Sequence, residues 1–104
     1  MLYPYLTLWD DTEICHSQIM EKDGKPVVEV HFEKPVESGF CSARCTLPDY
    51  TWQFNEGFSE KEIAFFDEFL RHNAHLLIKY AGTGGIHCAE MVPNRRIYHI
   101  LLVE

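Results

Sequence analysis

The chain has 104 residues, of which 46% are hydrophobic and 24% charged, as expected for one ordinary globular domain. Its 16 acidic side chains outnumber nine basic ones, and the net charge of −7 argues against nucleic acids and anionic membranes as partners. No segment has the pattern of a signal peptide or a membrane span, and four cysteines are too few for a disulfide scaffold. We therefore expect a single cytoplasmic domain over residues 1–104.

The first half of the chain predicts strands joined by turns. Residues 27–33 alternate between apolar and polar side chains, which places Val28 and Phe32 on the same face of a strand. Asp23 and Gly24 precede this strand, and the pair is typical of a tight hairpin turn because both residues tolerate positive φ. Several of the strands follow one another as hairpins and form a meander. The four predicted strands are residues 2–8, 12–20, 27–33 and 40–47.

A helix is the most clearly marked element of the second half. Ser59 and Glu62 form a capping box, in which each side chain satisfies a backbone N–H of the other residue. Apolar side chains then recur at helical spacing as far as Ala81, and Gly82 occupies the position where helices often end. Residues 48–58, before the helix, indicate an aromatic loop.

Two short strands are predicted after the helix, at residues 86–92 and 97–103. The fold class is then α+β: an antiparallel β-meander packed against one long amphipathic helix, with short C-terminal strands. Residues 93–104 would form an edge strand of this domain or a tail exchanged with a neighbouring chain.

The predicted helix carries more apolar surface than one sheet needs. Its apolar arc covers about 220°, whereas a surface helix needs a stripe of roughly 100°. Either the aromatic loop or the C-terminal strand covers the second flank, or the flank binds a partner. The residues that we expect at such a binding surface are apolar and come from the loop, the helix flank and the last strand: Tyr50, Trp52, Phe54, Phe65, Phe69, Leu76, Tyr98 and Leu101.

A polar sheet face offers an alternative function. Glu29, His31 and Glu33 share one face of their strand, and Arg44 lies on a face of the next strand. If the two faces coincide, the histidine could transfer protons beside a charge-stabilising guanidinium, as in small ribonucleases, and His16 could join them. A solvated sheet face has the same sequence pattern.

A metal site is not predicted, although the chain has four cysteines and six histidines. Cys41 and Cys45 would lie about 13 Å apart on one strand, too far for a shared metal ion or a disulfide. No Cys-x-x-Cys motif is present. We therefore expect no metal and no cofactor, and a metal-binding module is the third hypothesis.

The segment from Gly57 to Ile63, followed by the helix as far as Tyr80, resembles a group of small uncharacterised bacterial domains. These domains have a Gly-Phe-Ser-x-x-Glu helix start and are met near toxin–antitoxin-type operons. The resemblance implies a partner-binding accessory role and carries over no catalytic residue. Together with the helix flank, it favours a non-enzymatic interaction module that binds itself, as a homodimer, or another protein. The alternative is a small hydrolase or nuclease that uses the polar sheet face.

Overall fold

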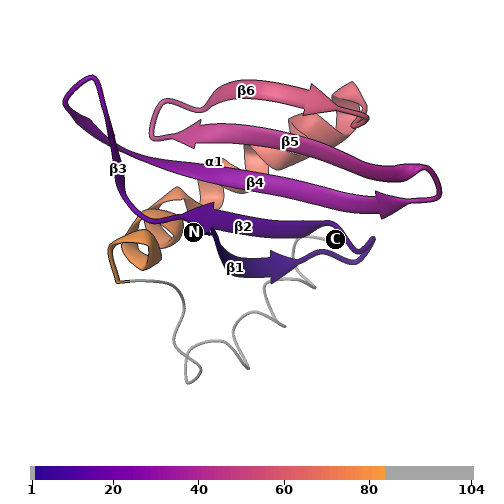
Figure 1. The fold of residues 1–104 in the computed structure, drawn as a ribbon, viewed down its shortest axis with the longest axis horizontal. Coiled ribbons are helices and arrows are strands. Elements are labelled where there is room, and N and C mark those ends of the chain that lie inside the picture. Colours follow the sequence, from indigo (N-terminus) through magenta and orange to yellow (C-terminus); the bar gives the residue numbers. More distant parts are fainter. Residues whose placement is uncertain (1, 84–104) are drawn as a thin grey trace.

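The computed structural model describes residues 2–83, which form an antiparallel sheet and one long helix (Figure 1). The main sheet has the strand order β1-β2-β4-β5-β6, and β3 pairs with β4. This architecture confirms the predicted α+β class. The strands predicted at residues 86–92 and 97–103, and the tail at 93–104, lie outside the described residues. The elements are β1 (Leu2–Thr7), β2 (Glu13–Ser17), β3 (Met20–Lys22), β4 (Lys25–Val36), β5 (Gly39–Leu47), β6 (Thr51–Glu56) and α1 (Glu60–Thr83).

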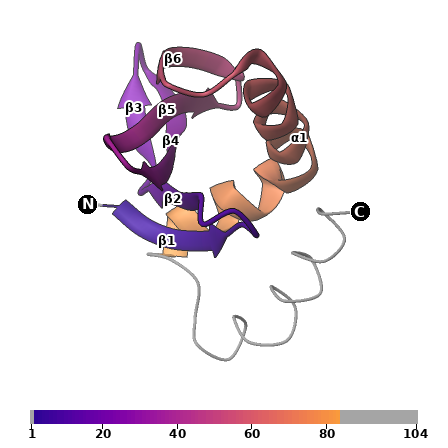
Figure 2. The same cartoon turned by 90° about the vertical axis from the view of Figure 1, so that its right-hand side faces the viewer.

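The sheet curves around α1, as Figure 2 shows, so the helix lies against the concave face of the sheet. We call this concave side the inner face and the convex side the outer face. Val28, Val30 and Phe32 of β4 are buried on the inner face, as their alternation predicted. Within residues 2–83, α1 lacks the length of apolar sequence that a membrane-spanning helix requires.

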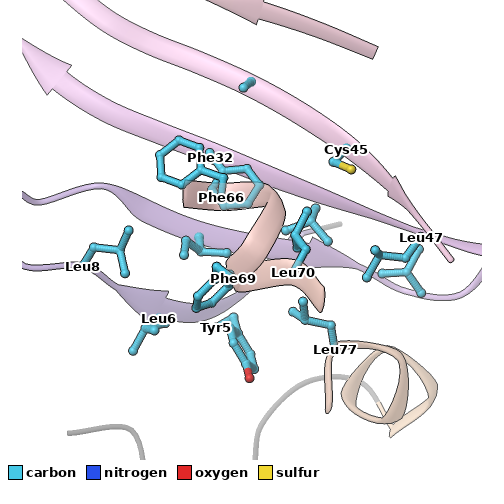
Figure 3. Packing of buried hydrophobic residues seen from close by; sticks show 14 of the residues in the cluster. Tyr5, Leu6, Leu8, Phe32, Cys45, Leu47, Phe66, Phe69, Leu70 and Leu77 are labelled. Atoms are coloured by element: carbon cyan, nitrogen blue, oxygen red, sulfur yellow. The ribbon is translucent and has the colours of Figure 1, made fainter. Parts of the chain in front are cut away.

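Aliphatic and aromatic side chains fill the space between the inner face and α1 (Figure 3). Phe32 of β4 stacks on Phe66 of α1 with ring centroids 4.4 Å apart. Phe58, just before the helix, meets Phe66 edge-on at 5.0 Å. These contacts fix the start of α1 against the middle of the sheet.

Two local predictions are confirmed and a third is wrong. Asp23 and Gly24 both have positive φ, 55° and 79°, between the paired strands β3 and β4. The Ser59 N–H donates to Glu62 Oε1 at 2.9 Å and the Glu62 N–H donates to Ser59 Oγ at 3.2 Å, which completes the capping box. The helix does not end before Gly82 but continues to Thr83.

The predicted strand at residues 12–20 is divided into β2 and β3. It is interrupted after Ser17, whose Oγ accepts the Glu29 N–H at 2.9 Å and donates to the Gln18 carbonyl at 2.7 Å. The side chain of Ser17 thereby replaces a backbone partner at this point of the sheet. The main pairing with β4 ends here, and β3 resumes it from Met20.

Residues 51–56 form the strand β6, where the sequence indicated a loop. Trp52 pairs with Cys45 and Phe54 pairs with Arg44, so Gln53 is an additional residue on β6. Such a β-bulge turns residues that are two apart toward opposite faces of the sheet. The bulge therefore breaks the alternation by which a strand is recognised in a sequence.

Candidate functional site

Strand β1 covers much of the apolar helix flank for which the sequence analysis identified no definite covering element. A bulge between Pro4 and Leu6 allows both Tyr5 and Leu6 to be buried. The Tyr5 hydroxyl donates to Asn73 Oδ1 at 2.7 Å, and its ring meets Phe69 edge-on at 6.2 Å. Phe69 is only 1% exposed, so it belongs to the core and presents almost no surface to a partner.

The remaining flank residues are partly covered. Phe65 is half-buried and meets Trp9, in the turn after β1, edge-on at 5.2 Å. Leu76 is also half-buried, and Trp9 itself is 50% exposed. Among the described residues, β1 and its turn cover this flank, rather than the aromatic segment predicted from the sequence. Tyr98 and Leu101 lie outside the described residues.

Two residues of the predicted aromatic loop contact the opposite flank of α1. The Arg71 guanidinium lies over the Tyr50 ring, 4.3 Å from its centroid. Trp52 Nε1 donates to Asp67 Oδ1 at 3.4 Å, and its ring lies 5.5 Å from that of Phe32. Tyr50 and Trp52 therefore attach β6 to the helix.

Phe54 belongs instead to a row of side chains that crosses the outer face. Cys15 of β2 lies opposite His31 of β4, which lies opposite Arg44 of β5, which lies opposite Phe54 of β6. The structure thus places the polar face of β4 and the polar face of β5 side by side, as the alternative hypothesis from the sequence required. His16 does not join them, because it is buried on the inner face and Cys15 takes the outward position.

The environment of His31 favours the neutral form of its imidazole. Burial lowers the pKa of His31 below its ordinary value, and the positive charge of Arg44 lowers it further. Glu29 and Glu33 oppose this effect, and Glu29 Oε1 lies 3.5 Å from His31 Nε2. The neutral ring could accept a proton from a bound molecule.

Arg44 lies next to one exposed aromatic side chain, Phe54, and on the same face of β5 as a second one, Phe40. Its guanidinium lies over the Phe54 ring, 5.0 Å from the centroid, and its Nε is covered without a hydrogen-bond partner in the described part of the chain. Phe54 is 37% exposed. Phe40, which pairs with Pro35 near the β4–β5 turn, is 68% exposed. Sequence reasoning missed Phe40, although it shares the alternation of Arg44 along β5.

A row of carboxylates crosses the outer face next to these residues. Glu13 of β2 lies directly opposite Glu33 of β4, and Ser42 of β5 separates Glu33 from Glu56 of β6. All three carboxylates are exposed, and none forms an ion pair with another residue in the range 2–83. We call these exposed groups, together with the adjacent arginine, the outer patch: Phe40, Phe54, Arg44, Glu13, Glu33 and Glu56.

The two described thiols on the inner side differ in burial. Burial raises the pKa of Cys45 to about 12, which leaves it protonated and unreactive. Cys41 is half-buried, and its Sγ lies where a side chain at Gly57 would begin. Over residues 2–83, no three His, Cys, Asp or Glu side chains are grouped so that they could hold a metal ion.

Comparison with protein-family models, with curated proteins and with solved structures gave no match to this chain. Its function is therefore inferred from the residues of the outer face and their surroundings.

Proposed function

We propose that the chain is a protein-interaction module and that the outer patch is its binding surface. The observation that carries this proposal is the pair of exposed phenylalanines on the same face as Arg44: Phe54 lies directly opposite Arg44, and Phe40 lies four residues away along β5. Aromatic residues and arginine are the types enriched in the energetically important parts of protein interfaces. No described element packs on this face, since α1 lies on the inner side (Figure 2).

The proposal keeps the interaction module expected from the sequence but places its surface elsewhere. Phe69 lies in the core, and Phe65 is partly covered by Trp9, so the helix flank presents less apolar surface than its sequence suggested. Edge pairing is also disfavoured, because both edge strands carry bulges, at Tyr5 in β1 and at Gln53 in β6. A surface made of side chains is the better candidate.

Site-specific photo-crosslinking in the cells that produce the protein tests this surface. A photoreactive amino acid at Ser42, inside the outer patch, is compared with one at His75, on the exposed side of α1. We expect defined adducts from position 42 that disappear when Phe40→Ser and Phe54→Ser are combined. The adducts should persist in the matched control that combines Ile19→Ser and Val36→Ser, because these residues are similarly exposed outside the patch.

Two results would contradict the proposal. One is the same set of adducts from positions 42 and 75. The other is an unchanged set of adducts in the Phe40 and Phe54 double variant. Circular dichroism of each variant establishes that a lost adduct does not reflect an unfolded chain.

A small hydrolase or nuclease is the second candidate, and the neutral His31 beside Arg44 and Glu29 favours it. The curvature of the sheet opposes it, because side chains on a convex face diverge, whereas catalytic groups converge on a substrate. The test is hydrolysis of single-stranded RNA by the purified chain and by the His31→Gln and Arg44→Lys variants. Cleavage that both substitutions abolish would replace the interaction proposal with this one.

A further inference from the structure

The carboxylates of the outer patch indicate the chemistry of the partner. Glu13 and Glu33 face each other on neighbouring strands, an arrangement that destabilises a sheet when both side chains are charged. Glu56 adds a third carboxylate in the same row, on β6. All three are exposed, so the row presents a negative surface beside the two phenylalanines.

Positive side chains of the described residues do not neutralise this row. Lys34 lies 3.4 Å from Asp10 and 3.5 Å from Glu62, and Arg71 is paired with Asp67 on α1. Arg44, the nearest cation in the patch, stacks on Phe54 and forms no ion pair within residues 2–83. Among residues 2–83 the row therefore has no ion-pair partner, and a cationic ligand could supply one.

A second copy of the chain is a poor occupant of this face. Each copy carries a net charge of −7, and two outer patches would bring like-charged rows toward each other. Like charges brought together across an interface oppose association. A cationic partner gains from both the local row and the overall charge, because opposite charge also speeds the encounter.

We infer that the outer patch binds a basic protein segment that presents Lys or Arg side chains next to apolar ones. The cations would pair with Glu13, Glu33 and Glu56, while the apolar groups contact Phe40 and Phe54. This inference rests on the proposed function and specifies the class of partner.

The test uses a defined probe, a blocked pentapeptide of alternating Lys and Phe, and its counterpart in which Glu replaces Lys. Each is titrated into the full-length ¹⁵N-labelled chain while backbone amide shifts are recorded. We expect the Lys peptide to shift the amides of Glu33, Ser42 and Arg44 in a saturable way. The Glu peptide should leave them unchanged, and added salt should weaken the binding of the Lys peptide.

Matched glutamine variants separate the carboxylate row from the overall charge. Combining Glu13→Gln, Glu33→Gln and Glu56→Gln should weaken peptide binding at least about fivefold, as the loss of three exposed ion pairs allows. The control combines Glu21→Gln, Glu60→Gln and Glu68→Gln, exposed positions outside the patch, and changes the net charge equally. It should change the affinity less than about twofold.

Three other results would lead to different conclusions about the partner. Equal weakening by both triple variants would overturn the inference, because attraction would then depend on total charge alone. No binding of the Lys peptide, combined with position-42 adducts that require Phe40 and Phe54, would overturn the basic partner and keep the interaction module. Self-association in sedimentation experiments that the Phe40 and Phe54 double variant abolishes would replace the basic partner with a second copy.

Discussion

The polar residues on the inner and outer faces of the sheet differ in the contacts that they make. Three polar contacts join the inner face to the helix or strengthen it: Tyr5 donates to Asn73, Asn73 Nδ2 donates to the Phe69 carbonyl at 2.8 Å, and Trp52 donates to Asp67. On the outer face Glu13 and Glu33 oppose each other, and Arg44 Nε has no partner among the described residues. The inner face thus carries polar contacts that support the core, whereas the outer face carries exposed charged groups without ion-pair partners among the described residues.

The largest difference between the two faces should appear when one phenylalanine is removed from each. Phe32→Ala removes a fully buried ring stacked on Phe66 and should lower the free energy of unfolding by about 3–5 kcal/mol. Phe40→Ala removes an exposed ring and should change it by less than about 0.5 kcal/mol. Urea unfolding followed by tryptophan fluorescence measures both. Similar losses for the two variants would mean that Phe40 supports the fold rather than a binding surface.

A smaller effect is expected where β1 meets the helix. Tyr5→Phe removes the hydroxyl that donates to the buried Asn73 Oδ1 and should cost about 1–2 kcal/mol. Tyr50→Phe is the control, because Tyr50 is only half-buried and its contact with Arg71 is made by the ring. Both are measured by urea unfolding. Equal stability of Tyr5→Phe and the wild type would contradict a buried polar contact that holds β1 on α1.

On the outer face, one charge reversal should stabilise the protein. Glu33→Lys replaces a pair of like charges opposite Glu13 by a pair of opposite charges, and should raise the free energy of unfolding by roughly 0.2–1 kcal/mol. Glu37→Lys, in the exposed turn after β4, makes the same change in net charge away from the row. The same reversal should weaken binding of the Lys peptide. A destabilised Glu33→Lys variant would show that the row does not oppose folding.

The smallest effect concerns the pH dependence due to His31. Burial and Arg44 lower its pKa in the folded protein below the ordinary 6.5, which the unfolded chain retains. Below about pH 6.5 the unfolded state therefore binds the proton more readily, so stability falls as the pH decreases toward the folded pKa. Above that pH both states are neutral at His31 and its contribution is constant. Urea unfolding between about pH 5 and 8 should give a shallower pH dependence for His31→Gln than for the wild type. Identical pH dependence would contradict the lowered pKa.

Local patterns were sufficient to predict several elements. The alternation of Val28, Val30 and Phe32 identified the inner side of β4, and the capping box at Ser59 identified the start of α1. The Asp23-Gly24 turn was predicted for the same reason, since its conformation depends on two adjacent residues. Each of these features is decided within a few positions along the chain.

Two bulges account for the main differences from prediction. Gln53 interrupts the alternation of β6, which therefore resembled a loop rich in aromatic residues. The bulge at Tyr5 turns two neighbouring residues of β1 inward, and this covers Phe69, which the helix pattern alone left without a partner. A bulge is a property of strand pairing, so the sequence of one strand does not reveal it.

The candidate site likewise has some features that were predictable from the sequence and others that were not. Glu29, His31, Glu33 and Arg44 were recognised from alternation, because their faces follow from the residues within each strand. Their direct opposition, the replacement of His16 by Cys15 in the row, and the stacking of Arg44 on Phe54 required the register between strands. The exposure of Phe40 likewise became apparent only with the position of the β4–β5 turn.

By itself, the sequence determined the α+β class, the capped start of the helix and the polar and apolar faces of β4 and β5. These depend on interactions between residues that are near in the chain. Only the tertiary structure decided that β1 closes the helix flank, that β6 completes the sheet, and that Phe54 lies over Arg44 while Phe40 is exposed on the other side of a row of carboxylates. The reason is that register and curvature arise from the packing of distant segments, which no local pattern encodes.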